Sequence, residues 1–303
     1  MVGNAGPGGQ DGTSGAGSAE TTGLAPPMKP IDLAVAAACE RAERLAWADF
    51  CRAATGAVAT ACGVGLTEIA GATAGRATRV DILAFNRAVG LGMDQAATPA
   101  ALDGVFEFFA ETERFFVQVS PTAQPPALAE WLISRGMRHH NNWVKLFRNA
   151  REPLRLTPVP GVRVEPIGPA SAPAAATLVG DAFGFPEALR TWWSAAIGRP
   201  GWIHYLAYID DQPIGTAAMY VTGELAWLGW AATREDARCK GAQSDLILRR
   251  MADAASAGCR WLVVETAEDN PEEPNPSTRN LRRLGFQFAY LRPNYIWARE
   301  RSP

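Results

Sequence analysis

The sequence is poor in the residues that build metal centres and disulfide frameworks. It has 303 residues but only five cysteines and three histidines. An odd number of scattered cysteines without a C-x-x-C pair is typical of reduced thiols in the cytoplasm. We therefore expect a cytoplasmic protein with no metal site. The cysteines concerned are Cys39, Cys51, Cys62, Cys239 and Cys259.

The sequence also lacks long hydrophobic runs and blocks of like charge. No apolar run approaches the roughly 18 residues that a membrane-spanning helix needs. The formal net charge is -2, so there is no basic footprint for nucleic acid or for an anionic membrane. Hydrophobic residues make up 48% of the chain, which is ordinary for a globular protein. We expect neither nucleic acid nor membrane among its partners.

The N-terminal segment, residues 1–28, is rich in Gly, Ser and Thr. Such a composition cannot bury enough surface to offset the entropy of ordering, so we expect a disordered tail. It has neither a basic start nor an apolar centre, so we do not expect it to be a signal peptide. Whether Met1 or Met28 is the true start stays open.

Two parts of the chain end in the same way. Residues 115–119, "FFVQV", predict a short strand, and so do residues 261–266, "WLVVET". Each is followed by a short helical pattern that ends at a glycine (Gly136 or Gly285) and then by apolar residues that predict an antiparallel strand pair. We therefore predict an α/β protein (α+β, with a mixed sheet) of two similar halves. The alternative is coincidence, because endings of this kind are common in α/β proteins.

The boundary between the halves is predicted near residues 151–162, where three prolines interrupt helix and strand. The first domain then spans 29–150 and the second 160–300. The second predicts the order β-α-α-β-β-β-α-β-α-β-β. The first predicts a helix at 31–54, three strands and a helix at 100–112. The three strands are expected at 59–64, 66–73 and 79–89.

Residues 238–250, "RCKGAQSDLILRR", place cations and a glycine directly before a helical pattern. A helix N-terminus carries unpaired N–H groups and about half a positive charge, so it suits a phosphate group. Arg238 and Lys240 add full charges, and Gly241 allows a close approach to the backbone. The alternative is an ordinary solvated helix start. The corresponding turn of the first half has no Arg or Lys, so we expect it to lack this site.

Residues 160–300 resemble the GNAT family of acyl-CoA N-acyltransferases. The resemblance rests on the order of elements and on R-x-x-G at 238–241. It implies a tandem GNAT-like fold, with a degenerate first half, and acetyl-CoA as co-substrate. The chain departs from the family pattern at Gln243, Cys239 and Glu235, where a small residue, Gly and Pro are usual. The implied acetyl-CoA-binding residues are Ala231, Ala232, Thr233, Arg238, Cys239, Lys240, Gly241, Ala242, Gln243, Ser244 and Asn275.

The resemblance implies transfer of an acetyl group to a primary amine. The reaction needs a base for the amine, a donor for the thioester oxygen and a proton for the leaving thiolate. The resemblance assigns the donor role to a main-chain N–H near Ala231 or Ala232. For the base, it points to Glu224, at the start of the fourth strand of the second half. The alternative is a solvent-facing turn residue.

The sequence does not clearly indicate which residue gives a proton to the leaving thiolate. Family members often have a tyrosine in the last helix, but the aligned position here is Leu281. Tyr290 is a substitute, and Ser277 acting through a water is another. Their alternative interpretations are a core tyrosine and a helix-start serine. His204 lies in a strand pattern and is expected to be a hydrogen-bonded strand residue.

The acceptor is expected to be a small-molecule amine or an amino acid with apolar surface. The two helices after the linker carry aromatic residues that in this family roof the acceptor pocket, although core packing is the alternative. These are Phe183, Phe185, Trp192, Trp193 and Trp202. Two other functions stay open: a non-catalytic acyl-CoA-binding or sensing module, and an interaction protein without ligand. A homodimer is one option for the oligomeric state.

Overall fold

A computed structural model describes residues 31–299, apart from 155, 271 and 273. The expected tail at 1–28 lies outside the described residues. Within these ranges, no helix has both the length and the apolar character to cross a membrane.

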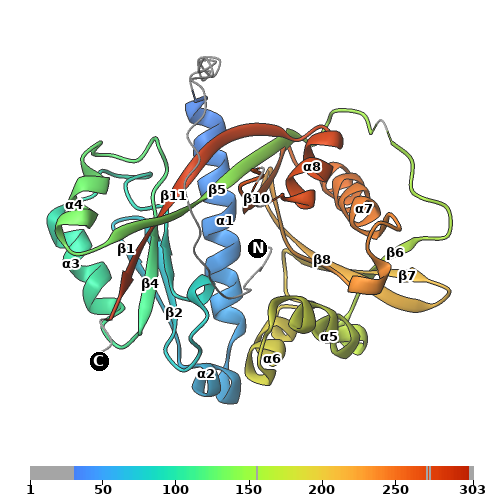
Figure 1. Ribbon diagram of the computed structural model, residues 1–303, viewed down its shortest axis with the longest axis horizontal. Helices are drawn as coiled ribbons and strands as arrows, with labels where there is room; N and C mark the ends of the chain where they lie inside the picture. The colour runs from blue at the N-terminus through green and yellow to red at the C-terminus, as the bar shows by residue number, and fades with distance from the viewer. Residues whose placement is uncertain (1–30, 155, 271, 273, 300–303) are drawn as a thin grey trace, which may run out of the picture.

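The described chain is built around one mixed sheet of eleven strands, in the order β1-β2-β3-β4-β11-β5-β10-β9-β8-β7-β6. Figure 1 shows the two longest strands, β5 and β11, crossing the molecule from one group of strands to the other. The strands are β1 Val64–Ile69, β2 Ala72–Ala77, β3 Arg87–Val89, β4 Arg114–Gln118, β5 Arg138–Asn149, β6 Arg163–Ile167, β7 Trp202–Ile209, β8 Gln212–Thr222, β9 Leu225–Thr233, β10 Trp261–Ala267 and β11 Gln287–Ala298.

Local signals mark the start of α3 and the end of α7. Thr98 caps α3 by accepting a hydrogen bond from the Ala101 N–H, and Pro99 occupies its first position. Gly258, with a φ of +80°, follows α7. The helices are α1 Leu33–Ala53, α2 Gly56–Cys62, α3 Pro99–Phe108, α4 Leu128–Ser134, α5 Ala172–Phe183, α6 Glu187–Ala195, α7 Ala242–Ser256 and α8 Pro276–Arg283, with 3-10 turns at Leu83–Phe85, Pro169–Ser171 and Glu235–Ala237.

The predicted strand pair at the end of each half is wrong. Each ending is a single strand of twelve residues, β5 or β11, and the two pair with each other. β5 lies between β10 and β11, and β11 lies between β4 and β5. Pro293 and Asn294 lie inside β11, where they pair with Asn142 and Asn141, and a register irregularity follows between Asn294 and Tyr295.

The first-half strands are shifted from their predicted places. Residues 59–64 fall mainly in α2, which ends at Gly63 with a φ of +65°. Residues 66–73 span the turn between β1 and β2, and 79–89 contain a 3-10 turn before β3. Small residues such as Ala and Gly carry weak local signals, and so packing against α1 determines which segments form strands.

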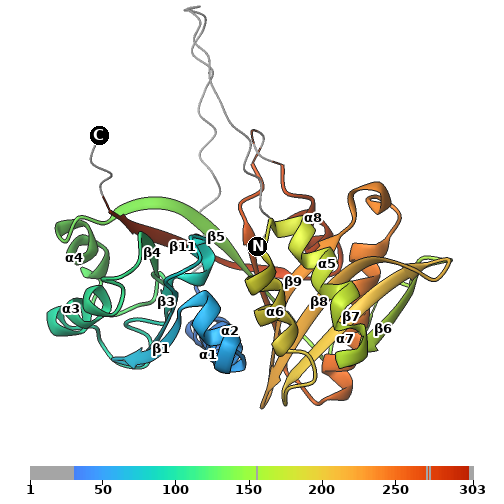
Figure 2. The ribbon, with the colours of Figure 1, turned by 90° about the horizontal axis from the view of Figure 1, so that it is seen from below.

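The helices cover both faces of the sheet around β9 and β10. On one face, α1, α5 and α6 pack against Trp227 and Val263 in an aromatic core. On the other, α7 and α8 pack against Leu228 and Leu262. Figure 2 shows α1 and α2 beside α6 between the two ends of the sheet. The N-terminal part of the chain therefore supplies the helix α1 that covers strands of the C-terminal part.

Candidate active site

The neighbouring parallel strands β9 and β10 part from each other halfway along their length. They pair from Leu225 with Trp261 to Leu228 with Val264, and no later residues of the two strands pair. β9 nevertheless continues to Thr233 and β10 to Ala267. Their facing edges beyond Leu228 are therefore not hydrogen-bonded to each other, and a ligand with amide groups could pair there.

A bulge in β9 coincides with this parting. Between the pairs Thr216–Ala232 and Ala218–Gly229, β9 has one more residue than β8. Trp230 lies in the bulge with a φ of +54°. A bulky residue with positive φ is a strained exception that costs about 1–3 kcal/mol, and such strain is concentrated at functional sites. The bulge re-aims the main chain of β9 at the point where β10 leaves it.

The N-terminus of α7 lies next in the chain. Cys239 and Gly241 have φ values of +63° and +91°, and Gly241 provides no side-chain cap for the first N–H groups of the helix. Turns with such residues, followed by a helix N-terminus, present N–H groups to an anion. Lys240 is exposed beside them, and Arg238 is exposed with its guanidinium 3.7 Å from Glu235.

The other predicted acetyl-CoA-binding side chains have protein partners. The Gln243 carbonyl oxygen accepts a hydrogen bond from Asn280 of α8, so this bulky side chain is directed at α8. Ser244 Oγ accepts from Arg283 at 2.8 Å. Asn275 is buried; it caps α8 and donates to Thr266 Oγ1 and the Ala267 carbonyl. We call the place where β9 and β10 part beside the N-terminus of α7 the corner. Main chain and small side chains are contributed there by Ala231, Ala232, Thr233 and Ala242.

The matching place in the first half has a different geometry. β3 and β4 are also parallel neighbours, but they pair up to their last residues, Val89 with Gln118. Beyond them the Gln124 main chain donates to the Gly92 carbonyl and accepts from the Ala97 N–H, both at 2.7 Å. The space between the strand ends is thus closed by the chain itself.

Glu265 lies in β10 directly after the last residue that pairs with β9. Its carboxylate accepts hydrogen bonds from Trp227 Nε1 at 2.9 and 3.1 Å and from Lys145 Nζ at 3.3 Å. It therefore lies on the face covered by α1, at the parting point. Sequence reasoning missed this residue. The available signal was a carboxylate inside the otherwise apolar stretch "WLVVET".

Glu265 belongs to a buried cluster of charges, which we call the charge cluster. Glu43 of α1 is at its centre and accepts from Arg87, Lys145 and Arg292. Burial alone would raise the pKa of Glu43, but the charges of these three cations lower it well below its ordinary value. The side chain of Glu265 is 6% exposed and the others are 0–2% exposed. The members are Glu40, Glu43, Arg87, Lys145, Glu265 and Arg292.

The structure does not bring the three predicted catalytic side chains together. Glu224 precedes β9 at the end remote from the parting, is exposed, and lies 3.8 Å from Arg151. It lines a hollow of about 400 Å³ with α1. Tyr290 is buried and its hydroxyl donates to Glu40 at 2.7 Å; burial raises its pKa well above the ordinary value. Ser277 is in the first turn of α8, and its N–H donates to Asn275.

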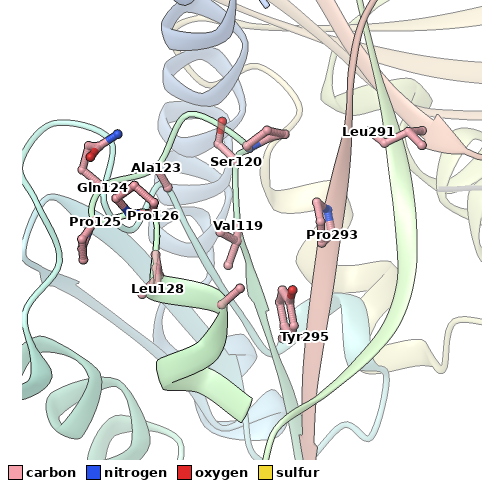
Figure 3. A pocket seen from close by; sticks show the side chains of 12 residues that line it. Val119, Ser120, Ala123, Gln124, Pro125, Pro126, Leu128, Leu291, Pro293 and Tyr295 are labelled. Atoms are coloured by element: carbon pink, nitrogen blue, oxygen red, sulfur yellow. The ribbon is translucent and has the colours of Figure 1, made fainter. Parts of the chain in front are cut away.

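The predicted acceptor aromatics are mostly core residues. Trp192 and Trp193 are fully buried, and Phe185 and Trp202 nearly so, while Phe183 packs at the edge of the same cluster. Phe50 of α1 stacks on Trp192 with ring centroids 4.8 Å apart. A second hollow, of about 260 Å³, lies between the end of β4, α4 and β11, and residues 119–129 and 291–295 contribute to its lining (Figure 3).

His204 is buried in β7 and, contrary to expectation, neither ring nitrogen has a hydrogen-bond partner. It contacts Trp193 edge-on at 4.9 Å. Burial lowers its pKa from 6.5 to about 3, so the folded protein holds the neutral ring while the unfolded chain protonates it below pH 6.5. This group therefore costs stability increasingly as the pH falls from 6.5 towards 3.

His204→Phe should remove that pH dependence. We expect the free energy of unfolding of the wild type, relative to the variant, to fall by about 2 kcal/mol between pH 7 and pH 5. Urea denaturation of both proteins at the two pH values measures it. An unchanged difference between them would show that folding does not lower the pKa of His204.

The order of elements around this parted corner can be compared with known proteins. The family model described as "Acetyltransferase (GNAT) family" matches residues 176–286, which include β9, the turn before α7 and β10. Residues 176–286 form a GNAT acetyltransferase domain. The comparison with curated proteins found no match. In the described part of the chain, the GNAT domain included, no three His, Cys, Asp or Glu residues are grouped as a metal site would require.

Solved structures are similar over more than the GNAT domain. A GCN5-related N-acetyltransferase from Kribbella flavida is 17% identical and covers 86% of this chain and 95% of its own, with a TM-score of 0.60. Another from Sphaerobacter thermophilus is 13% identical over 87% of this chain and 93% of its own, with a TM-score of 0.56. A tandem GNAT protein from the clavulanic acid biosynthesis pathway is 16% identical over 77% and 80%, with a TM-score of 0.51. At these identities the likeness shows the fold alone.

Proposed function

We propose that the chain is an N-acetyltransferase that transfers an acetyl group from acetyl-CoA to the primary amine of a small molecule or amino acid. The observation that carries the proposal is the parting of β9 and β10 beside the N-terminus of α7. The GNAT acetyltransferase domain supports the same chemistry. The protein acts in the cytoplasm, without metal, nucleic acid or membrane.

The proposal includes two GNAT-like halves, 29–150 and 160–300, with one acetyl-CoA site in the second. β5 of the first half pairs with β10 of the second, and β11 of the second half pairs with β4 of the first. This exchange of β5 and β11 and the repeated strand–helix–Gly endings support two related halves. The Gln124 main chain fills the matching corner of the first half. The role of the first half in this proposal is structural: its helix α1 covers the face of β9 and β10 that carries Trp227 and Val263, where the acceptor amine would bind.

The residues at the corner fit the groups that acetyl-CoA carries. The N–H groups at 239–244 and the Lys240 charge suit a diphosphate. The facing edges of β9 and β10 suit the amides of the pantetheine arm. Main-chain N–H groups in the β9 bulge stabilise the thioester oxygen as it becomes anionic.

Glu265 is the base of this proposal, in place of Glu224. The amine nitrogen forms a bond to the acetyl carbon, the carbon–sulfur bond breaks, and CoA leaves as the thiolate. Glu265 accepts the proton that the amine loses, while Trp227 and Lys145 hold the carboxylate in position. No side chain is assigned as thiolate acid, because the Tyr290 hydroxyl is buried and donates its hydrogen bond to Glu40.

A second candidate function is binding of acyl-CoA without transfer. The engagement of Tyr290 with Glu40 favours it, since a tyrosine acid is then absent from the corner. Both candidates require acetyl-CoA binding, but only the enzyme releases free CoA. A panel of amines assayed by thiol detection distinguishes them, and no release with any amine would favour the binding module.

Isothermal titration with acetyl-CoA should show one site per chain, and Gly241→Val should weaken it at least about tenfold. A side chain at a φ of +91° is strained, and its Cβ would lie 2.6 Å from a Val159 methyl group. Gly258→Val is the matched control, because Gly258 has a φ of +80° and open space at the other end of α7. Equal affinities of the two variants would contradict the site.

A further inference from the structure

The described part of the linker between β5 and β6, residues 150–154 and 156–162, passes with Val159 over the first turn of α7. Figure 1 shows it as a green trace on the outer side of α8 and α7. The Cβ that Gly241 lacks would lie 2.6 Å from Val159 Cγ2 and 2.9 Å from Val159 Cβ. Val159 therefore packs directly on the glycine of the proposed diphosphate-binding turn.

A buried carboxylate holds Val159 in this place. The Val159 N–H donates to both oxygens of Asp245, at 2.9 and 3.2 Å. Asp245 is only 3% exposed, and burial raises its pKa. An acid in the first turn of a helix ordinarily serves the free N–H groups of that helix. Here the acid contacts the linker instead. The N-cap residue of the helix is Gly241, so no side chain caps its first N–H groups.

The linker is also fixed at its other end. The guanidinium of Arg148 donates to the carbonyl oxygens of Glu152 and Pro153, each at 3.0 Å. Between the two attachment points, Leu154 and Leu156 are exposed. The hydrogen bonds from the Val159 N–H to Asp245 therefore hold this end of the linker on Gly241.

We propose that Asp245 is a positioning residue for acyl-CoA: through Val159 it holds the linker against Gly241 and keeps the diphosphate-binding turn in its binding conformation. We call the contact of Val159, Gly241 and Asp245 the clasp. The proposal rests on the proposed function for its ligand. Because binding and the clasp favour the same conformation of the turn, each strengthens the other.

Charge repulsion and the clasp predict opposite changes in acetyl-CoA affinity when Asp245 is replaced. A diphosphate at the N-terminus of α7 is repelled by a nearby carboxylate, so removal of the Asp245 charge alone should tighten binding. The clasp predicts the opposite. Asp236 provides the matched control, because it is an exposed carboxylate in the preceding turn whose side chain bonds Arg234 and not the linker.

The first measurement is acetyl-CoA affinity by isothermal titration. Asp245→Ala should weaken the dissociation constant about tenfold or more, the size expected for a lost hydrogen bond to a charged group. Asp245→Asn keeps an acceptor oxygen and should recover most of the affinity, and Asp236→Ala should bind as tightly as the wild type or more tightly. An Asp245→Ala variant that binds as tightly as Asp236→Ala would overturn the proposal.

The second measurement is hydrogen exchange without ligand. Pro158 and Pro160 have no N–H, so the Val159 amide is the only one among the three residues. Its exchange should be slow in the wild type and in Asp236→Ala, and faster in Asp245→Ala. Equal exchange in all three would show that there is no clasp. A wild type that fails to bind acetyl-CoA would defeat the proposed function and with it the role of the clasp, while slow Val159 exchange would still establish the contact.

Discussion

Glu43→Gln should lower the free energy of unfolding by about 3–5 kcal/mol, the usual cost of removing one partner from a buried ion pair. Glu43 is fully buried and accepts hydrogen bonds from Arg87, Lys145 and Arg292. The variant leaves these three cations facing the two remaining carboxylates of the charge cluster. Urea denaturation followed by the fluorescence of the ten tryptophans measures the loss.

Acid should weaken the wild type through the same residue. The pKa of Glu43 is lowered in the folded state, so its contribution to stability is present above the ordinary pKa of a glutamate. That contribution is lost as the pH falls from there towards the lowered folded value. Glu43→Gln should therefore lose less stability than the wild type between neutral and acid pH.

A charge-balanced variant tests whether electrostatics is the cause. Adding Lys145→Met to Glu43→Gln leaves two buried carboxylates and two buried guanidinium groups in the charge cluster. This double variant should be more stable than Glu43→Gln alone, because Lys145→Met removes the buried positive charge that Glu43→Gln leaves without its partner. If the double variant is less stable than the single one, packing and not charge explains the effect.

The second half of the fold was predictable because its signals are local. The apolar segments 202–209 and 213–221 flank Asp210 and Asp211 in the sequence; they form most or all of β7 and β8, and the two aspartates lie in the turn between them at positive φ. The exchange of β5 and β11 was not predictable. An apolar pattern predicts that a strand forms, but it does not say which of several apolar edges the strand joins.

The candidate site divides in the same way. The turn at Arg238–Gly241 was predictable, because cations, a glycine and a helix start are adjacent in the sequence. Glu265 was not, because its partners Trp227 and Lys145 lie 38 and 120 residues away. Tyr290 was predicted as a substitute acid, but its hydroxyl donates a hydrogen bond to Glu40 of α1, which is 250 residues away in the sequence.

Glu265→Gln should lower kcat for acetyl transfer by about 10²- to 10⁴-fold, the usual contribution of a positioned general base. The amide can still accept from Trp227 Nε1 but cannot take a proton from the amine. Acetyl-CoA affinity should stay within a few-fold of the wild type, because the diphosphate-binding turn is untouched. Steady-state kinetics and isothermal titration on the same preparation separate the two effects.

A second carboxylate decides between two assignments of the base. Glu224→Gln should retain the wild-type kcat, since Glu224 is exposed at the remote end of β9. If Glu224→Gln loses activity while Glu265→Gln keeps it, the sequence-based assignment holds.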